Sequence, residues 1–125
     1  MLEAVLTTQA PQPIGPYSQA IRSGDMLFCS GQVALDPATG AMKNESIEAE
    51  VTQVMQNLSA VLSAAGLAFT NVVKTTIFLT DLNDFAAVNA LYESLLAGAR
   101  PARSTVEVSK LPKGARVEIE CIAMR

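Results

Sequence analysis

The sequence predicts an α+β fold in which two helices pack on one face of a β-sheet. Two stretches repeat apolar residues every three or four positions, as amphipathic helices do. The remaining ordered stretches alternate apolar and polar residues or are short apolar runs, which is typical of strands. The predicted order of elements is β-β-β-α-β-α-β-β, and two helices can cover one face of such a sheet.

The first three predicted strands precede the first helix. Residues 3–7 form a short edge strand, and residues 20–22 pair with residues 26–30 across a Gly-Asp turn. Between them, residues 10–17 contain three prolines and a glycine, so they form an ordered loop rather than a helix or strand.

The two helices have recognisable ends. Ser46 is a suitable N-cap for the first, which Gly66 ends. The second opens at residues 81–84 and ends before Gly98. Apolar stripes mark their buried sides, with Val51, Val54, Met55, Leu58, Val61, Leu62 and Ala65 on the first helix and Phe85, Val88, Leu91, Tyr92, Leu95 and Leu96 on the second.

Three further strands are predicted at residues 72–80, 103–108 and 116–124, the last two joined across residues 110–114. In the first of these, one predicted face carries Val73, Thr75, Ile77 and Leu79, and the other carries Val72, Lys74, Thr76 and Phe78. In the last strand, Val117, Ile119, Cys121 and Ala123 oppose Glu118, Glu120, Ile122 and Met124. Because both faces are largely apolar, we expect the uncovered face to pack against other copies of the chain.

Composition narrows the function classes. The 125 residues suit a single domain, and nine Lys and Arg against twelve Asp and Glu give a net charge of −3. This balance disfavours nucleic acid as a partner. No apolar run is long enough for a membrane span, and no signal-peptide layout is present, so the expected location is the cytoplasm.

The chain contains no histidine, which excludes Ser-His-Asp and Cys-His nucleophile systems. Cys29 and Cys121 lie in apolar strand-like runs, and we interpret them as small buried hydrophobic residues in a reducing compartment. With no metal-ligand cluster and no phosphate-binding loop, we expect no metal and no cofactor.

Arg103 is the first candidate binding residue. It follows Pro101, which ends the preceding helical pattern, and it begins a strand that we expect to be buried. A fixed guanidinium binds a carboxylate or phosphate through two donors at once. The alternative is a structural ion pair with Glu107 or Glu118.

Glu118 and Glu120 lie on the same predicted strand face, with Cα atoms about 7 Å apart. A buried, unpaired carboxylate has a raised pKa and can exchange protons with water. The alternative is that they pair with Arg103, Arg116 or Lys74. These groups could bind a small carboxylic acid and add water to it, and the other polar candidates are Tyr17, Ser30 and Asn89.

Six motifs resemble the RidA/YjgF family of reactive-intermediate (enamine/imine) deaminases. They occur in the family's order from about residue 10 to the C-terminus: residues 14–20 (IGPYSQA), 30–32 (SGQ), 73–76 (VKTT), 81–85 (DLNDF), 101–104 (PARS) and 118–120 (EIE). The resemblance implies a single RidA-like domain over residues 1–125 with a chorismate-mutase-like fold. It also implies a homotrimer with sites in the clefts between subunits.

The resemblance further implies a 2-iminobutanoate/2-iminopropanoate deaminase, which converts intermediates such as 2-aminoacrylate to 2-oxo acids and ammonia. Arg103 would bind the substrate carboxylate and Glu118 would hold the attacking water. Tyr17, Ser30 and Gly31 would line the pocket, with Asn89 nearby.

Two features depart from the family pattern. Thr105 stands where many members have cysteine, which argues against a thiol mechanism; the resemblance implies that main-chain groups contact the ligand there. Residues 97–100 form a shorter segment than usual, and Arg100 replaces an aromatic residue, so the pocket shape is expected to differ.

Two other functions compete with deamination. A non-catalytic trimer that binds small carboxylates, or acts like a chaperone, would use the same Arg103 and Glu118. Ribonuclease activity, reported for some relatives, is disfavoured by the net charge of −3 and the absence of histidine.

Overall fold

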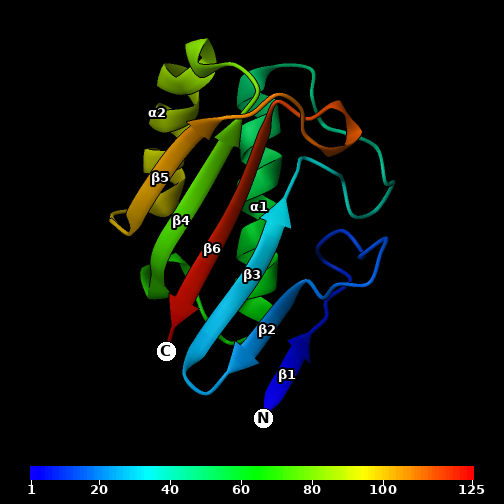
Figure 1. Ribbon diagram of the computed structural model, residues 1–125, viewed down its shortest axis with the longest axis vertical. Coiled ribbons are helices and arrows are strands. Elements are labelled where there is room, and N and C mark those ends of the chain that lie inside the picture. The colour runs from blue at the N-terminus through cyan, green and yellow to red at the C-terminus, as the bar shows by residue number, and fades with distance from the viewer.

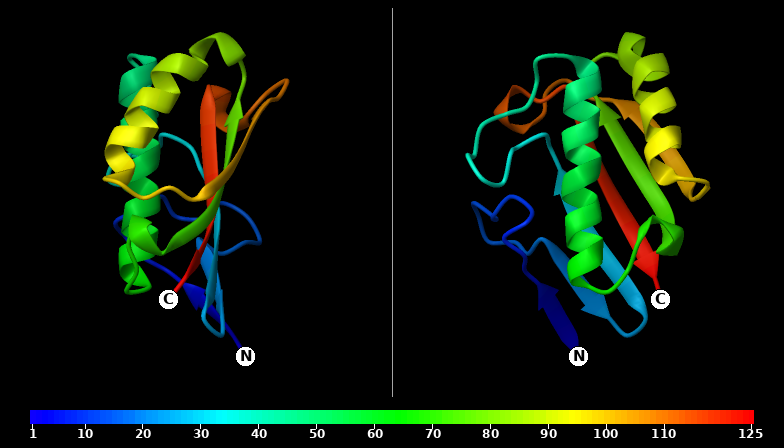
Figure 2. Two further views of the ribbon diagram at one scale, coloured as in Figure 1. Left: turned by 90° about the vertical axis from the view of Figure 1, so that its left-hand side faces the viewer. Right: turned by 180° about the vertical axis from the view of Figure 1, so that it is seen from behind.

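The computed structural model describes residues 1–125 as a six-stranded sheet with two helices on one face (Figure 1, Figure 2). The helices are α1 (Ile47–Ala64) and α2 (Phe85–Leu96). The strands are β1 (Leu2–Val5), β2 (Ala20–Ser23), β3 (Met26–Gln32), β4 (Val72–Leu79), β5 (Ala102–Glu107) and β6 (Val117–Met124). This confirms the predicted α+β class and the order of elements.

The last strand lies in the middle of the sheet. The strand order is β1-β2-β3-β6-β4-β5, and β6 pairs antiparallel with both β3 and β4. Helix α2 connects β4 to β5, which are parallel as a helical crossover requires. Strands β5 and β6 are therefore consecutive in sequence but not neighbours in the sheet. A segment containing the 3-10 helix Pro112–Gly114 links them.

The predicted helix ends agree closely with the structure. The Ser46 side chain accepts a hydrogen bond from the backbone N–H of Ala49, and Gly66 has a φ of 77° just past α1. The predicted start at residues 81–84 is a short 3-10 helix, Leu82–Asp84, which leads directly into α2.

The core lies between the helices and the covered face of the sheet. Its largest side chains with almost no exposure are Leu27, Leu58, Leu62, Ile77, Leu79 and Ile119. The predicted inward face of β6 is confirmed, because Val117, Ile119, Cys121 and Ala123 are all buried. Cys29 and Cys121 are free, buried register partners on β3 and β6, so the interpretation that they are buried is confirmed.

The predicted faces of β4 were wrong at its first two residues. The pairing with β6 shifts between Val72 and Lys74, which is a β-bulge or similar irregularity. As a result Val72 joins the core and Val73 is 43% exposed, the reverse of the prediction from strict alternation. From Thr75 onward the predicted alternation holds.

The other face of the sheet has no helix over it (Figure 2). Phe28, Val106 and Met124 are 45%, 41% and 47% exposed on this open face. Such an apolar surface is consistent with packing against another chain, as the strand pattern predicts. No helix of this chain is both long enough and apolar enough to cross a membrane.

Candidate functional site

A cavity of about 580 Å³ opens where β3 meets β6. We call it the β3–β6 cavity. It is lined by Pro11, Gln12, Ile14, Tyr17, Gln19, Ser30, Gly31, Gln32, Val33, Leu35, Pro112, Lys113, Glu118 and Glu120. The proline-rich loop before β2 forms one wall, and the segment before β6 forms another. Four predicted site residues, Tyr17, Ser30, Gly31 and Glu118, therefore come together here.

Gly31 creates the space that the Glu118 side chain occupies. A Cβ at position 31 would lie 2.0 Å from Glu118 Oε2, far inside van der Waals contact. The neighbouring Ser30 is held by two bonds, because its Oγ donates to the Ser18 carbonyl at 2.6 Å and its N–H donates to the Gln19 carbonyl at 3.0 Å. The pairing of β3 with β6 shifts between Cys29 and Gln32, so this irregularity places Gly31 beneath the carboxylate.

The Glu118 carboxyl has a raised pKa, first because it is partly buried and second because the negative charge of Glu120 lies nearby. The alternative that Glu118 and Glu120 pair with Arg103, Arg116 or Lys74 was wrong. The three ion pairs in the chain join Lys43 to Asp36, Arg116 to Glu50 and Arg125 to Asp25. Glu118 is thus an uncompensated carboxylate on a cavity wall.

Arg103 lies in a different cavity, of about 430 Å³, between α2 and the start of β5. We call it the α2–β5 cavity. It is lined by Asn89, Tyr92, Glu93, Leu96, Arg100, Pro101 and Arg103. Arg100, in the segment before Pro101, contributes a second guanidinium to its wall.

The Arg103 guanidinium is oriented by helix α2. Its Nη1 donates to Asn89 Oδ1 at 2.6 Å, and its Cζ lies 5.4 Å from the ring centroids of both Phe85 and Tyr92. The alternative of an ion pair with Glu107 or Glu118 was therefore wrong. The expectation of a buried strand was also wrong, because β5 is the sheet edge and Arg103 is exposed.

Thr105 follows two residues after Arg103 and so lies on the same face of β5. Its Oγ1 is buried without a hydrogen-bond partner. Its backbone pairs with Ile77 of β4, on the side of β5 toward the sheet. The hydroxyl is therefore neither hydrogen-bonded nor exposed to solvent in the single chain.

The candidate residues thus divide between the two faces of one sheet. Arg103 points toward α2 on the helix-covered side, as its contacts with Asn89 and Phe85 show. Glu118 alternates with the buried Val117 and Ile119 and so points to the open face. Within one chain, Arg103 and Glu118 cannot both contact the same small molecule.

Three polar residues that we did not predict as site residues also belong to this region. Gln19 and Gln32 are buried at the β3–β6 cavity, and both fall within the sequence motifs at residues 14–20 and 30–32. Lys113 lines the same cavity. Its φ of 61° is a left-handed backbone conformation, which the sequence gives no reason to expect at a lysine. No group of three or more acidic or cysteine side chains is placed to hold a metal ion.

The chain thus has an α+β fold with an uncompensated carboxylate on one face of the sheet and an oriented guanidinium on the other. The family model described as Endoribonuclease L-PSP matches residues 7–125. The chain belongs to this family, which is the RidA/YjgF family that the sequence motifs indicated.

Several curated proteins are similar over nearly their whole length. Protein DfrA of Myxococcus xanthus is 54% identical, with 98% of this chain and 95% of the relative covered. A 2-iminobutanoate/2-iminopropanoate deaminase of Salmonella typhimurium is 47% identical, with 100% of this chain and 99% of the relative covered. The mouse protein of the same name is 46% identical, with 98% of this chain and 91% of the relative covered.

Solved structures share the fold. The crystal structure of the YjgF gene product from E. coli has a TM-score of 0.94 at 45% identity, with 98% of each chain covered. E. coli TdcF, crystallised with bound serine, has a TM-score of 0.94 at 39% identity, also with 98% of each chain covered.

Proposed function

We propose that this protein is a 2-iminobutanoate/2-iminopropanoate deaminase, which hydrolyses reactive imines to 2-oxo acids and ammonia. The observation that carries the proposal is that the chain has both a group that binds carboxylates and a group that accepts protons. Arg103 is oriented by α2 with donors left free, and Glu118 is an unpaired carboxylate with a raised pKa. The names of the Salmonella and mouse relatives support the same reaction.

The proposed site forms between two subunits of a homotrimer. Arg103 and Glu118 of one chain lie on opposite faces, so a substrate must take them from different chains. One subunit supplies Arg103, with Asn89 and Thr105 beside it. The neighbouring subunit supplies the wall of the β3–β6 cavity with Tyr17, Ser30, Gly31 and Glu118. The apolar open face is the surface that assembly would cover.

The substrate carboxylate is bound by the Arg103 N–H groups that Asn89 leaves free. Asn89 and the rings of Phe85 and Tyr92 hold the guanidinium flat, which limits its loss of side-chain entropy on binding. A small imino acid offers few other polar groups, so this contact determines where the C=N carbon lies.

Glu118 acts on water. Its carboxylate accepts a proton from a water molecule as the oxygen attacks the C=N carbon, and it delivers that proton to the imine nitrogen, which gives a tetrahedral aminol. The carboxylate then takes the proton of the aminol hydroxyl and delivers it to the amino group. The C–N bond breaks as the C=O bond forms, so ammonia leaves and the 2-oxo acid remains. 2-Aminoacrylate enters the same sequence after it tautomerises to 2-iminopropanoate.

The test is ammonia release from 2-iminopropanoate freshly generated by an amino-acid oxidase. Losing a desolvated bidentate Arg contact costs roughly 2–5 kcal/mol. Arg103→Ala should therefore lower the catalysed rate at least ~30-fold, at about 1.4 kcal/mol per tenfold. Arg103→Lys should lose nearly as much, because an ammonium group cannot form the same fork. Arg125→Ala, which removes an exposed guanidinium bonded to Asp25, is the matched control.

A non-catalytic receptor for small carboxylates is the second candidate, favoured by the serine bound in the related TdcF structure. It predicts that 2-oxobutanoate binds through Arg103 while imine hydrolysis stays at the uncatalysed rate. Calorimetry with 2-oxobutanoate beside the ammonia assay separates the two functions. Wild-type deamination by Arg103→Ala would contradict both.

A further inference from the structure

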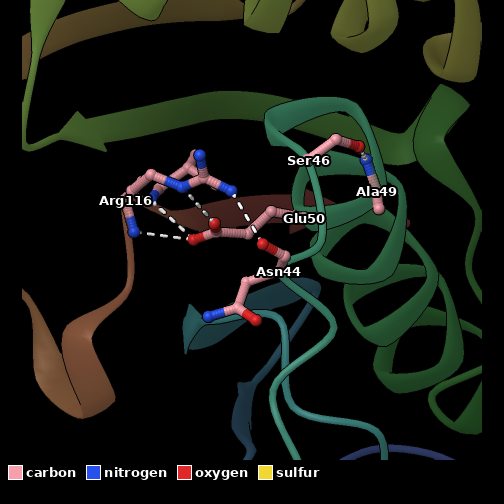
Figure 3. A network of polar contacts seen from close by, with 6 residues as sticks. Asn44, Ser46, Ala49, Glu50 and Arg116 are labelled. Atoms are coloured by element: carbon pink, nitrogen blue, oxygen red, sulfur yellow. Dashed lines mark hydrogen bonds and ion pairs between the residues drawn. The ribbon is translucent and has the colours of Figure 1, made fainter.

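Glu50 is a buried carboxylate that the proposed reaction does not use. It lies in the first turns of α1 and is 0% exposed. Its Oε1 accepts a hydrogen bond from Arg116 Nε at 2.8 Å. Its Oε2 accepts the backbone N–H of Arg116 at 2.6 Å (Figure 3). The same oxygen accepts the backbone N–H of Val117 at 3.3 Å.

These contacts are concentrated at the beginning of β6, immediately before Glu118. From the other side, the Arg116 carbonyl accepts the backbone N–H of Thr80, next to β4. The Arg116 side chain also donates from Nη2 to the Asn44 carbonyl at 3.1 Å (Figure 3). The peptide groups that precede Glu118 are therefore held from α1 and from β4 at once.

We propose that Glu50 is a positioning residue for Glu118, acting through the Arg116 and Val117 backbone; this inference rests on the proposed function. The Glu118 carboxylate lies in the space left by the missing side chain of Gly31, so its position on the cavity wall depends on where the start of β6 lies. A displacement of the start of β6 would move that carboxylate away from the water that it activates. Misplacing a catalytic group by about 1 Å can cost roughly 100-fold in rate.

The two oxygens of Glu50 do different things, so the positioning role can be separated from the ion pair. Glu50→Gln keeps an oxygen that can accept both backbone N–H groups but loses the charge that pairs with Arg116. Glu50→Asp keeps the charge, and the long Arg116 side chain can follow it. Because aspartate is one methylene shorter, it cannot reach both backbone donors.

A positioning role and an ion-pair role therefore predict opposite orders of kcat for the two variants. If Glu50 positions Glu118, Glu50→Gln retains kcat and Glu50→Asp loses it. If Glu50 serves only the ion pair, Glu50→Asp behaves like the wild type and Glu50→Gln is damaged. Glu48→Gln is the matched control, because Glu48 is an exposed residue in the same turn of α1.

The experiment uses the full chain at a temperature where thermal melts show every variant folded. We expect kcat on 2-iminopropanoate to fall roughly 30- to 100-fold in Glu50→Asp and less than threefold in Glu50→Gln. KM should stay within about twofold in both, because the Arg103 that binds the carboxylate belongs to the neighbouring subunit and is not held by Glu50. Comparable kcat values for Glu50→Asp and the wild type would overturn the inference.

A second measurement does not depend on activity. The Glu118 carboxyl is titrated by carbon NMR in each variant; the other titratable groups lining its cavity are Glu120, Lys113 and Tyr17. In Glu50→Asp the carboxyl should turn toward water, and its pKa should fall toward the ordinary glutamate value. An unchanged titration would overturn the positioning role even if the wild type proved not to deaminate, an outcome that would remove the proposed function alone.

Discussion

At the scale of single residues, the site contrasts an arginine and a glutamate in unlike environments. Arg103 is exposed, yet one hydrogen bond and two aromatic rings orient it. Glu118 is partly buried, yet no ion pair compensates its charge. In the proposed reaction the oriented arginine binds the substrate carboxylate, and the raised pKa makes the glutamate a stronger base than an ordinary carboxylate.

The raised pKa of Glu118 makes the free energy of unfolding depend on pH. A carboxyl whose pKa is higher in the folded than in the unfolded state stabilises the folded state in its protonated form. This stabilisation is complete only below the unfolded pKa, where the carboxyl is protonated in both states. That contribution is lost as pH rises through the folded pKa. The ordinary pKa of a glutamate carboxyl is 4.5, so the loss begins near that pH and is complete above the raised pKa.

We predict that Glu118→Gln is more stable than the wild type at pH 7, because the amide never carries the uncompensated charge. The difference should shrink as pH falls and disappear below about pH 4, where the wild-type carboxyl is protonated in both states. Thermal unfolding of both proteins between pH 3.5 and 8 measures it. Equal melting temperatures at pH 7 would contradict the assignment of Glu118 as a group disfavoured by folding.

At the scale of elements, the junction of β3 and β6 determines where the Glu118 carboxylate, the proposed proton acceptor, lies. The pairing shift between Cys29 and Gln32 leaves Gly31 facing Glu118. The core on the other face of the sheet is unaffected, since the residues that alternate with Glu118, namely Val117 and Ile119, are buried against the helices. A change at Gly31 therefore acts on the site and not on the core.

We predict that Gly31→Ala loses activity with little loss of stability. The new Cβ would meet Glu118 Oε2 at 2.0 Å and Glu118 Cδ at 2.8 Å, so the carboxylate must move. Moving the end of a flexible side chain costs the fold little, but it displaces the proton acceptor, and we expect kcat to fall by roughly 100-fold.

Steady-state kinetics and a thermal melt of the same preparation check this prediction. Gly24→Ala is a control for introducing a side chain at a glycine, because no atom lies within 4 Å of the Cβ position there, although its φ of 58° adds some strain. A Gly31→Ala protein with wild-type kcat would show that Glu118 need not occupy its present position.

At the scale of the whole molecule, one sheet separates the two halves of the proposed site. The α2–β5 cavity lies on the side of the helices, and Glu118 lies on the open face. The exposed Phe28, Val106 and Met124 leave that open face apolar. Assembly would cover this surface and bring the two halves together in the same step.

We predict that two inactive variants restore activity when their subunits mix. In mixed trimers of the two variants, a site is intact when the Glu118→Gln chain supplies Arg103 and the Arg103→Ala chain supplies Glu118. Random mixing in equal amounts makes about one quarter of the sites intact. The mixture should therefore show about one quarter of wild-type activity after joint refolding.

The separate variants, refolded alone, are the controls. If the mixture is no more active than its components, Arg103 and Glu118 act in a site within one subunit. That result would contradict their positions on opposite faces of the sheet. Sedimentation at micromolar concentration provides the companion measurement. A 13.2 kDa monomer would remove the inter-subunit site altogether.

The amino-acid sequence by itself determined the features that depend on local periodicity and local chemistry. The order of elements, the Ser46 cap and the inward face of β6 follow from residue spacing and were predicted correctly. Six motifs were sufficient to indicate the family. These features could be predicted because neighbouring residues along the chain produce them.

Only the tertiary structure decided what depends on contacts between distant segments. It placed β6 between β3 and β4, introduced the pairing shift at Val72 and directed Arg103 to Asn89 rather than to a glutamate. It also joined Glu50 to the start of β6, across 66 residues of sequence. Strand pairing and side-chain partners are long-range choices that a one-dimensional pattern does not encode, because many registers satisfy the same alternation.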